Sequence, residues 1–141
     1  MNIEAIYRAG TGSVCLRPLF LSAVAAGFPS PAEEYIEGKL DLNKHLISNP
    51  ASTYFVRVTG ESMINAGIHP DDMLVVDRAV NAKDGDVVIA CIDGELTVKT
   101  MRIKRGQIWL VPENKAYQKQ KISDAMDFAV WGVVRHVIHS F

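Results

Sequence analysis

The chain has 141 residues, and its 15 Lys and Arg against 16 Asp and Glu give a formal net charge of -1. This length fits one compact domain and excludes a large multidomain enzyme, while an apolar share of 48% is enough to build a core. The balanced charge excludes the strongly basic surface of proteins that grip nucleic-acid backbones, so we expect no direct sequence-specific binding to DNA.

The cysteine and histidine content argues against disulfides and metal centres. Cys15 and Cys91 are too few for a disulfide framework and have no metal-binding spacing. His136 and His139 alone are too few to indicate a metal site. We therefore expect a protein of the reducing cytoplasm that uses no cofactor and no metal.

The longest apolar runs are also informative. None reaches the ~20 residues that a membrane helix needs, so no membrane span is expected. The segment Leu19–Ala26 imitates the end of a secretory signal, but Arg17 and Pro18 interrupt the apolar region that should precede the cut. The signal-peptide interpretation is therefore disfavoured.

The first fifty residues lack the pattern of regular strands. Residues 1–18 show no sustained periodicity, which predicts a flexible, irregular arm. Ser30 precedes a proline and two acidic residues, which predicts a short helix over Pro31–Glu37 that ends at Gly38. A second short helix is expected after Asp41, and the next proline stops it.

From residue 53 onward, short runs rich in Val, Ile, Thr and aromatic residues alternate with turn residues, which predicts a mostly β domain of short strands and hairpins. Asp93-Gly94 predicts a two-residue type I′ turn, and Lys104-Arg105-Gly106 is expected to join the next two strands. The expected strands are Tyr54–Val58, Met73–Asp77, Asp86–Ile92, Glu95–Ile103, Gln107–Pro112 and Phe128–Ile138.

Ser62 is a candidate nucleophile because it follows a strand that ends at Val58 and lies in a tight bend that runs to Gly67. Such a bend can expose a hydroxyl group, and the backbone N–H of Met63 is a candidate donor to a developing oxyanion. Serine is also common in turns and helix caps, and the second glycine of the hydrolase Gly-x-Ser-x-Gly elbow is missing. The local sequence leaves both interpretations open.

Lys99 is unusual because its strand is mostly apolar. Side-chain alternation places Thr97, Lys99 and Met101 on one face, which continues onto Val88 and Ala90 across the hairpin. Burial disfavours the ammonium form and lowers a lysine pKa, so a neutral lysine can act as general base beside a serine. The alternative is an edge-strand lysine that prevents aggregation.

Other catalytic arrangements fit less well. A triad of Ser62, Asp77 and His136 can be drawn, but surface position or packing explains the last two residues. No Ser-x-x-Lys motif occurs, which excludes the β-lactamase arrangement.

Several segments together resemble the LexA/UmuD family of self-cleaving serine peptidases, over nearly the whole chain. They are Ala26–Ala32, Ala51–Phe55, Gly60–Met63, Gly85–Val88, Asp93–Lys99 and Trp131–Val134. The resemblance implies that Ser62 is the nucleophile, that Lys99 is the general base, and that the Ala26-Gly27 bond of the same protein is cut. The apolar Leu19–Ala26 stretch then becomes a docking strand.

The resemblance also implies an organisation and a cellular role. Residues 1–26 would be a removable arm, residues 27–50 a linker with short helical turns, and residues 51–141 the β domain for catalysis and dimerisation. A RecA filament on single-stranded DNA would promote cleavage in the SOS response to DNA damage. The shortened homodimer would then serve a UmuC-type Y-family polymerase as an accessory subunit in error-prone translesion synthesis.

Two alternatives from other functional classes remain open at this point. The first alternative to a self-cleaving peptidase is a non-catalytic dimeric binding module. The second is a repressor-like regulator of the SOS response that acts by mixed dimerisation. A full repressor needs a helix-turn-helix domain before the cleavage site, and twenty-six residues cannot hold one. Signal peptidases also use Ser and Lys, but they need a membrane anchor.

Overall fold

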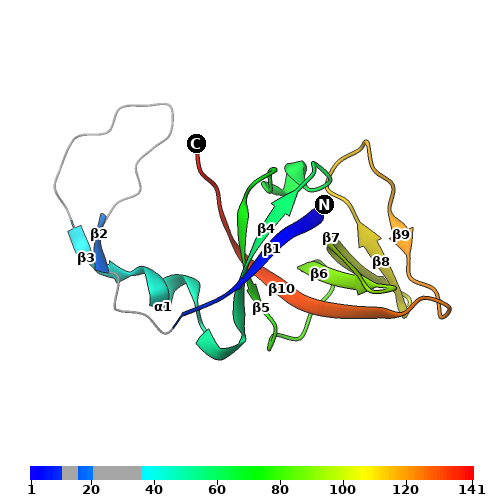
Figure 1. The fold of residues 1–141 in the computed structure, drawn as a ribbon, viewed down its shortest axis with the longest axis horizontal. Coiled ribbons are helices and arrows are strands. Elements are labelled where there is room, and N and C mark those ends of the chain that lie inside the picture. Colours follow the sequence, from blue (N-terminus) through cyan, green and yellow to red (C-terminus); the bar gives the residue numbers. More distant parts are fainter. Residues whose placement is uncertain (11–15, 21–35) are drawn as a thin grey trace. The chain divides into compact units, whose positions relative to one another are not determined.

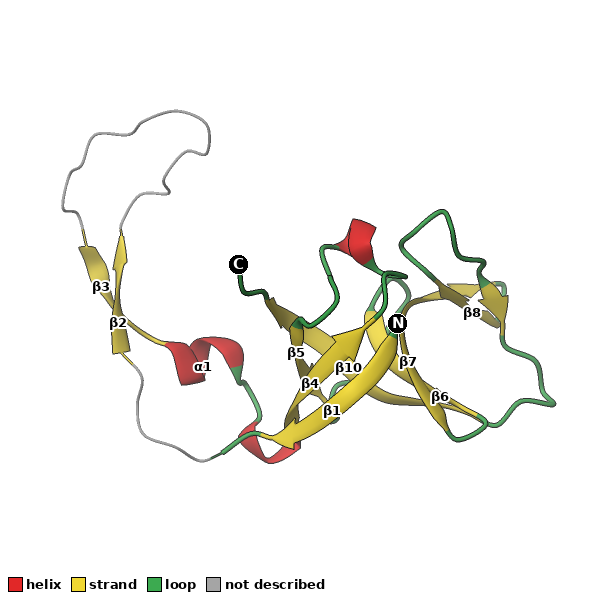
Figure 2. Ribbon diagram, turned by 45° about the horizontal axis from the view of Figure 1, so that its top comes forward, coloured by secondary structure: helices red, strands yellow, loops and turns green. Residues whose placement is uncertain are grey.

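The computed structural model describes residues 1–10, 16–20 and 36–141, and it is mostly β, as predicted (Figures 1 and 2). Two compact units are present, one made of residues 1–10 and 49–141 and the other of residues 11–48. The strands are β1 (Asn2–Arg8), β2 (Leu16–Phe20), β3 (Ile36–Asp41), β4 (Thr53–Thr59), β5 (Met73–Asp77), β6 (Val87–Ile92), β7 (Glu95–Lys104), β8 (Gln107–Val111), β9 (Gln120–Lys121) and β10 (Phe128–Ile138). The helices are α1 (Leu42–Leu46) and the 3-10 turns η1 (Pro50–Ser52) and η2 (Ile64–Ala66).

The first unit is built on one antiparallel sheet with the strand order β1-β4-β5-β10-β6-β7-β8-β9. β1 lies along β4 and also pairs with β7 through Asn2 and Thr97, which closes the strands from β1 to β7 into a ring. Buried apolar side chains of β4, β5, β6, β7 and β10 fill the core on either side of this sheet. The two clusters are Met1, Val56, Val58, Met63, Ile68, Leu74, Val76, Ile89 and Val98, and Val88, Ala90, Met101, Leu110 and Val133.

All six predicted strands are present, and no end differs by more than one residue from the prediction. The turn between β6 and β7 has positive φ at Asp93 (49°) and Gly94 (83°), as a type I′ turn requires. Lys104 still pairs with Gln107, so the turn between β7 and β8 is shorter than predicted and consists of two residues. The two-residue strand β9 was not predicted.

The prediction of an irregular arm over residues 1–18 is wrong for Asn2–Arg8, which form β1, and for residues 16–18, which belong to β2. Half-buried Ile3 and Ala5 alternate with exposed neighbours in β1, but the run is too short to give a clear signal. Pairing with the distant strand β4 supplies the backbone hydrogen bonds that hold β1 in place. Tertiary pairing therefore decides the conformation of this segment.

The second unit contains the β2–β3 hairpin and α1. The predicted helix after Asp41 is confirmed, and the Asp41 carboxylate caps it by accepting a 3.0 Å hydrogen bond from the Asn43 N–H. The predicted helix over Pro31–Glu37 is wrong at its C-terminal end, because Ile36 and Glu37 belong to β3, and its remaining residues lie outside the described part of the chain. The expected docking strand Leu19–Ala26 also lies outside the described residues from position 21 onward.

β10 is long enough to pair with β5 at one end and β6 at the other, with a register shift in each ladder. Gly132 lies where the strand passes from one partner to the other. A Cβ atom at this position would lie 2.5 Å from the Val76 Cγ1 atom, so only glycine fits without displacement of the core. No helix among the described residues has the length and apolarity to cross a bilayer.

Candidate active site

Ser62 lies in a turn between β4 and η2 and is 1% exposed. Gly60 makes the bend possible with φ of 85°, and Gly67 ends η2 with φ of 82°. The Ile68 N–H donates to the Met63 carbonyl at 3.3 Å, which closes the loop behind the serine. The strand-to-turn geometry predicted for Ser62 is therefore present, but its hydroxyl is covered.

Lys99 in the middle of β7 reaches this hydroxyl. Its Nζ donates to Ser62 Oγ at 3.2 Å, to Thr97 Oγ1 at 3.0 Å and to the Val98 carbonyl at 3.1 Å. The predicted hairpin face is also present, since Lys99 pairs with Val88 and Thr97 with Ala90. Two residues 37 positions apart thus form a Ser-Lys hydrogen bond, which is the geometry that a serine nucleophile and a lysine base need.

The environment of Lys99 disfavours its charged form. Burial lowers the pKa of this ammonium below its ordinary value of 10.5, and a hydrogen bond with the N-terminal amine works in the opposite direction without outweighing it. Within the described part of the chain, no carboxylate forms a salt bridge with Lys99. The neutral amine, which is the form that accepts a proton, is therefore easier to reach than in a free lysine.

A third group, the α-amine of Met1, occupies the same place. It donates to Ser62 Oγ at 2.5 Å, while the Met1 carbonyl accepts hydrogen bonds from Val98 N–H at 3.1 Å and Thr97 Oγ1 at 3.0 Å. Burial, together with the neighbouring Lys99, lowers the pKa of this amine to about 5, so it is neutral near pH 7. Nothing in the sequence pattern links the first residue to the serine, and this contact was missed.

The loop after β8 braces the serine turn and was also missed. Asn114 Nδ2 donates to the Glu61 carbonyl at 2.9 Å, and the Asn65 N–H donates to the Glu113 carbonyl at 2.9 Å. Glu113 Oε1 in turn accepts from Thr100 Oγ1 of β7 at 2.9 Å. These bonds tie the turn that carries Ser62 to the strand that carries Lys99.

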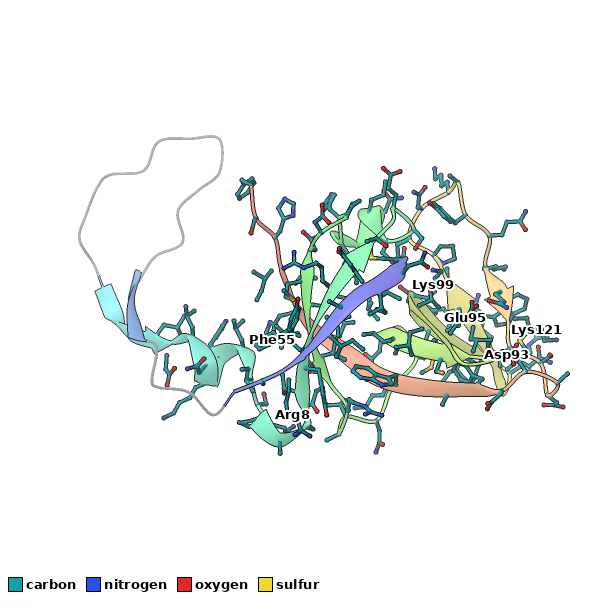
Figure 3. The ribbon with its side chains drawn as sticks, viewed as in Figure 1. Arg8, Phe55, Asp93, Glu95, Lys99 and Lys121 are labelled. Carbon is teal, nitrogen blue, oxygen red and sulfur yellow. The ribbon has the colours of Figure 1, made fainter. Side chains whose placement is uncertain are left out.

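The surroundings of the pair are hollowed on the side of β7. A cavity of about 570 Å³ is lined by Asn2, Glu95, Thr97, Lys99 and other side chains. Figure 3 shows Lys99 and Glu95 on this part of the molecule, next to the N-terminal end of β1. The cavity leaves room for a peptide on one side of Lys99.

The remaining predicted residues divide into three groups. The Met63 N–H has no backbone acceptor among the described residues, so it is available as an oxyanion donor, and that role remains a prediction. Asp77 belongs to another cluster, in which Asn49, Ser52 and the Ala79 N–H donate to its carboxylate, and not to a triad with Ser62. Ala26 and Gly27 lie outside the described residues.

One cluster in the described part of the chain has metal-ligand atoms close together. The ligand atoms of His69, Asp72 and His139 lie within 4.8 Å of one another. The buried Asp72 carboxylate already accepts the His69 backbone N–H at 2.8 Å through one oxygen and contacts His139 Nδ1 at 2.5 Å through the other. Because both oxygens have partners, an ion is not needed to satisfy the carboxylate.

Comparison with known proteins places this geometry in a family. The model of the Peptidase S24-like family matches residues 18–135, which include both Ser62 and Lys99. The chain belongs to the S24-like peptidase family. The resemblance inferred from the sequence motifs is confirmed at this level.

Relatives of the S24-like chain cover most of its length. Protein ImpA of Salmonella typhimurium is 48% identical over 124 residues, which are 88% of this chain and 84% of ImpA. Protein MucA of the same organism is 39% identical over 137 residues, which are 96% of this chain and 93% of MucA. The LexA repressor of Mycobacterium sp. (strain KMS) is 42% identical over 118 residues, which are 84% of this chain and 50% of the repressor.

Proposed function

We propose that this S24-like peptidase cuts its own Ala26-Gly27 bond with Ser62 as nucleophile and Lys99 as general base. The observation that carries the proposal is the 3.2 Å hydrogen bond from Lys99 Nζ to Ser62 Oγ, made by a lysine that has no carboxylate partner in the described part of the chain. A lysine held for stability alone gains more from an ion pair than from a serine hydroxyl.

In the first step, neutral Lys99 takes the proton of the Ser62 hydroxyl while Oγ attacks the Ala26 carbonyl carbon. The negative charge moves to the carbonyl oxygen, where the N–H of Met63 donates to it. The Lys99 ammonium then gives its proton to the Gly27 nitrogen as the C–N bond breaks. Residues 27–141 leave with a free amine, and the Ala26 carbonyl remains as an ester on Ser62.

In the second step, water hydrolyses this ester. Lys99 is neutral again after the first step and removes a proton from the attacking water. The tetrahedral intermediate collapses to the Ala26 carboxylic acid, and the proton on Lys99 returns to Ser62 Oγ. The dyad needs no metal or cofactor for these proton transfers, which residues in the described site carry out.

The relatives support a setting for this reaction. We infer a role in the bacterial SOS response, in the cytoplasm, in which a RecA filament on single-stranded DNA promotes cleavage. The shortened chain would act as a homodimer and as accessory subunit of a UmuC-type Y-family polymerase in translesion synthesis. Removal of residues 1–26 would then change which surfaces the protein offers to these partners.

The test is self-cleavage at alkaline pH, where Lys99 is increasingly neutral. Intact-mass analysis and N-terminal sequencing are expected to find a product that begins at Gly27. Ser62→Ala should abolish the reaction, and Lys99→Ala should slow it by roughly 100-fold or more, the usual contribution of a general base. A chain cut elsewhere would contradict the assigned bond.

Matched substitutions separate catalysis from general damage to the fold. Lys104→Ala removes an exposed lysine from the same strand, and Ser140→Ala removes an exposed serine. Both variants are expected to be cut at the wild-type rate. If wild-type protein stays intact at high pH and with RecA filaments, a non-catalytic binding module becomes the better description.

A further inference from the structure

The catalytic pair is closed in the structure, and β1 closes it. Ser62 is 1% exposed and Met1 is 6% exposed, although a nucleophile must contact the carbonyl carbon that it attacks. The α-amine of Met1 donates to the same Ser62 oxygen that Lys99 contacts. In this arrangement no peptide carbonyl can approach Ser62 from that side.

Residues 1–9 are held mainly by backbone hydrogen bonds to neighbouring strands, as a bound extended peptide would be. The Met1 carbonyl accepts from the Val98 N–H and from Thr97 Oγ1, and the Ala9 N–H donates to the Thr53 carbonyl at 3.1 Å. Between these points β1 pairs with β4 from Asn2 to Arg8. Figure 3 shows Lys99 close to one end of β1 and Arg8 at the other. β1 thus places a free amine next to the nucleophile, which is the group that the product after a cleaved bond carries.

Side-chain anchoring of β1 is concentrated at its start. Met1 belongs to the core cluster and Ile3 packs against it, whereas Ile6 is 39% and Tyr7 is 51% exposed. A register shift at Glu4 interrupts the ladder to β4. The strand is therefore fixed by a few apolar contacts and by backbone hydrogen bonds, which an incoming extended segment could replace.

We propose that β1 is an autoinhibitory strand, which occupies the cleft of the Ser62–Lys99 pair as an amine-bearing product peptide would and must leave before the scissile segment can enter. The proposal rests on the proposed function of this site. Release of β1 also removes the α-amine from Ser62 Oγ, so the hydroxyl keeps its hydrogen bond with Lys99 and gains a free side for the scissile carbonyl. The cleavage rate then depends on the fraction of molecules in which β1 is undocked.

The test uses the full chain with two matched substitutions in β1. Ile3→Ser removes a side chain that packs on the core, and Ile6→Ser removes the same side chain from an exposed position of the same strand. Ile3→Ser is expected to raise the self-cleavage rate roughly five- to tenfold, because undocking becomes easier by about half the transfer free energy of an isoleucine. Ile6→Ser should change the rate less than twofold.

Two further measurements do not depend on self-cleavage. Hydrogen exchange of the Val98 and Ala9 amides should become faster in Ile3→Ser and stay unchanged in Ile6→Ser, because both amides donate across the edge of β1. A fluorophosphonate probe phosphonylates serine Oγ and releases fluoride and the hydroxyl proton, and it should label Ser62 faster in Ile3→Ser. Mass spectrometry of the labelled peptide measures this rate.

The outcomes separate the two proposals. Faster exchange and labelling without self-cleavage in any variant support the autoinhibitory strand and contradict the proposed function. Faster exchange with unchanged labelling and cleavage shows that β1 undocks without uncovering the serine, which overturns the inference. Equal exchange in Ile3→Ser and Ile6→Ser overturns it as well.

Discussion

Lys99 and Asp77 lie in the same sheet, and both have a pKa below the ordinary value, but the two shifts have opposite meanings. Burial lowers the pKa of Lys99 and so favours its neutral form. Burial works against the charge of Asp77 too, but hydrogen bonds from Ser52, Asn49 and the Ala79 N–H outweigh it and stabilise the carboxylate. The sheet therefore satisfies one ionised group fully and leaves the other without a countercharge among the described residues.

This difference separates a structural site from a reactive one. The Asp77 carboxylate joins the η1 turn to the end of β5, and each of its bonds lowers the free energy of the folded state. The Lys99 amine has neutral oxygen partners at Ser62, Thr97 and Val98, and its neighbour at the N-terminus is an amine, not a carboxylate. A desolvated amine costs stability, and such a cost is typical of catalytic positions.

The largest expected effect on stability follows from removal of the Asp77 carboxylate. Asp77→Ala removes a buried carboxylate that accepts three hydrogen bonds, and it should lower the free energy of unfolding by about 2–4 kcal/mol. Urea denaturation followed by tryptophan fluorescence measures this change. The self-cleavage rate of the folded variant should stay within about twofold of wild type.

Lys99→Met is the matched opposite, because it replaces a desolvated amine with an apolar chain of similar length. Its free energy of unfolding should equal or exceed the wild-type value, while self-cleavage is lost. Equal destabilisation by Asp77→Ala and Lys99→Met would show that the two sites do not differ in the way described.

The two sites also differ in how far the sequence predicts them. Ser62 and Lys99 were found because a serine on a bend and a lysine in an apolar strand break local patterns, and family motifs link them. Thr97 was placed on the correct face, since alternation along β7 is a local property. The hydrogen bonds of Asp77 depend on Asn49 and Ser52, which lie 28 and 25 residues away, and no local pattern indicates such contacts.

The same reasoning explains the correct strands and the missed one. β5 and β10 carry long apolar runs between turn residues, so their bounds were predicted without error. β1 has only two inward side chains after Met1, and its conformation comes from pairing with β4. The contact of the Met1 amine with Ser62 spans 61 residues and is visible only in the folded chain.

The pH dependence of cleavage should show whether the neutral form of Lys99 is the reactive one. Below the pKa of Lys99 the rate should rise about tenfold per pH unit, because only the neutral amine accepts the serine proton, and it should level off below the ordinary value of 10.5. The N-terminal amine facing Lys99 titrates near 5 and stays neutral throughout this range. A rate that does not fall at any point as the pH is lowered from 10 would contradict Lys99 as the base.

The contribution of Asp77 to stability should change at acidic pH, whereas the cleavage rate changes at neutral to alkaline pH. The folded-state pKa of Asp77 lies below 3.8, so the contribution is fully present above that value and is lost as the pH falls through the lowered one. Cleavage and this part of the stability therefore titrate in separate windows, which a rate profile and urea midpoints between pH 2 and pH 10 can resolve.

The smallest effect concerns Thr97, which contacts both Lys99 and β1. Its Oγ1 accepts a hydrogen bond from Lys99 Nζ and donates one to the Met1 carbonyl. Thr97→Val therefore removes one bond that positions Lys99 and one bond that holds β1 over the site. These changes have opposite effects on the cleavage rate in the intact chain, where the net effect should be small.

In an Ile3→Ser background, in which β1 is already loosened, the loss of the hydrogen bond to Lys99 should lower the cleavage rate roughly fivefold, equivalent to about 1 kcal/mol. Thr59→Val removes only a 3.5 Å contact to the Asn2 carbonyl and should leave that background unchanged. Equal rates for Thr97→Val and Thr59→Val there would mean that Thr97 does not position the lysine.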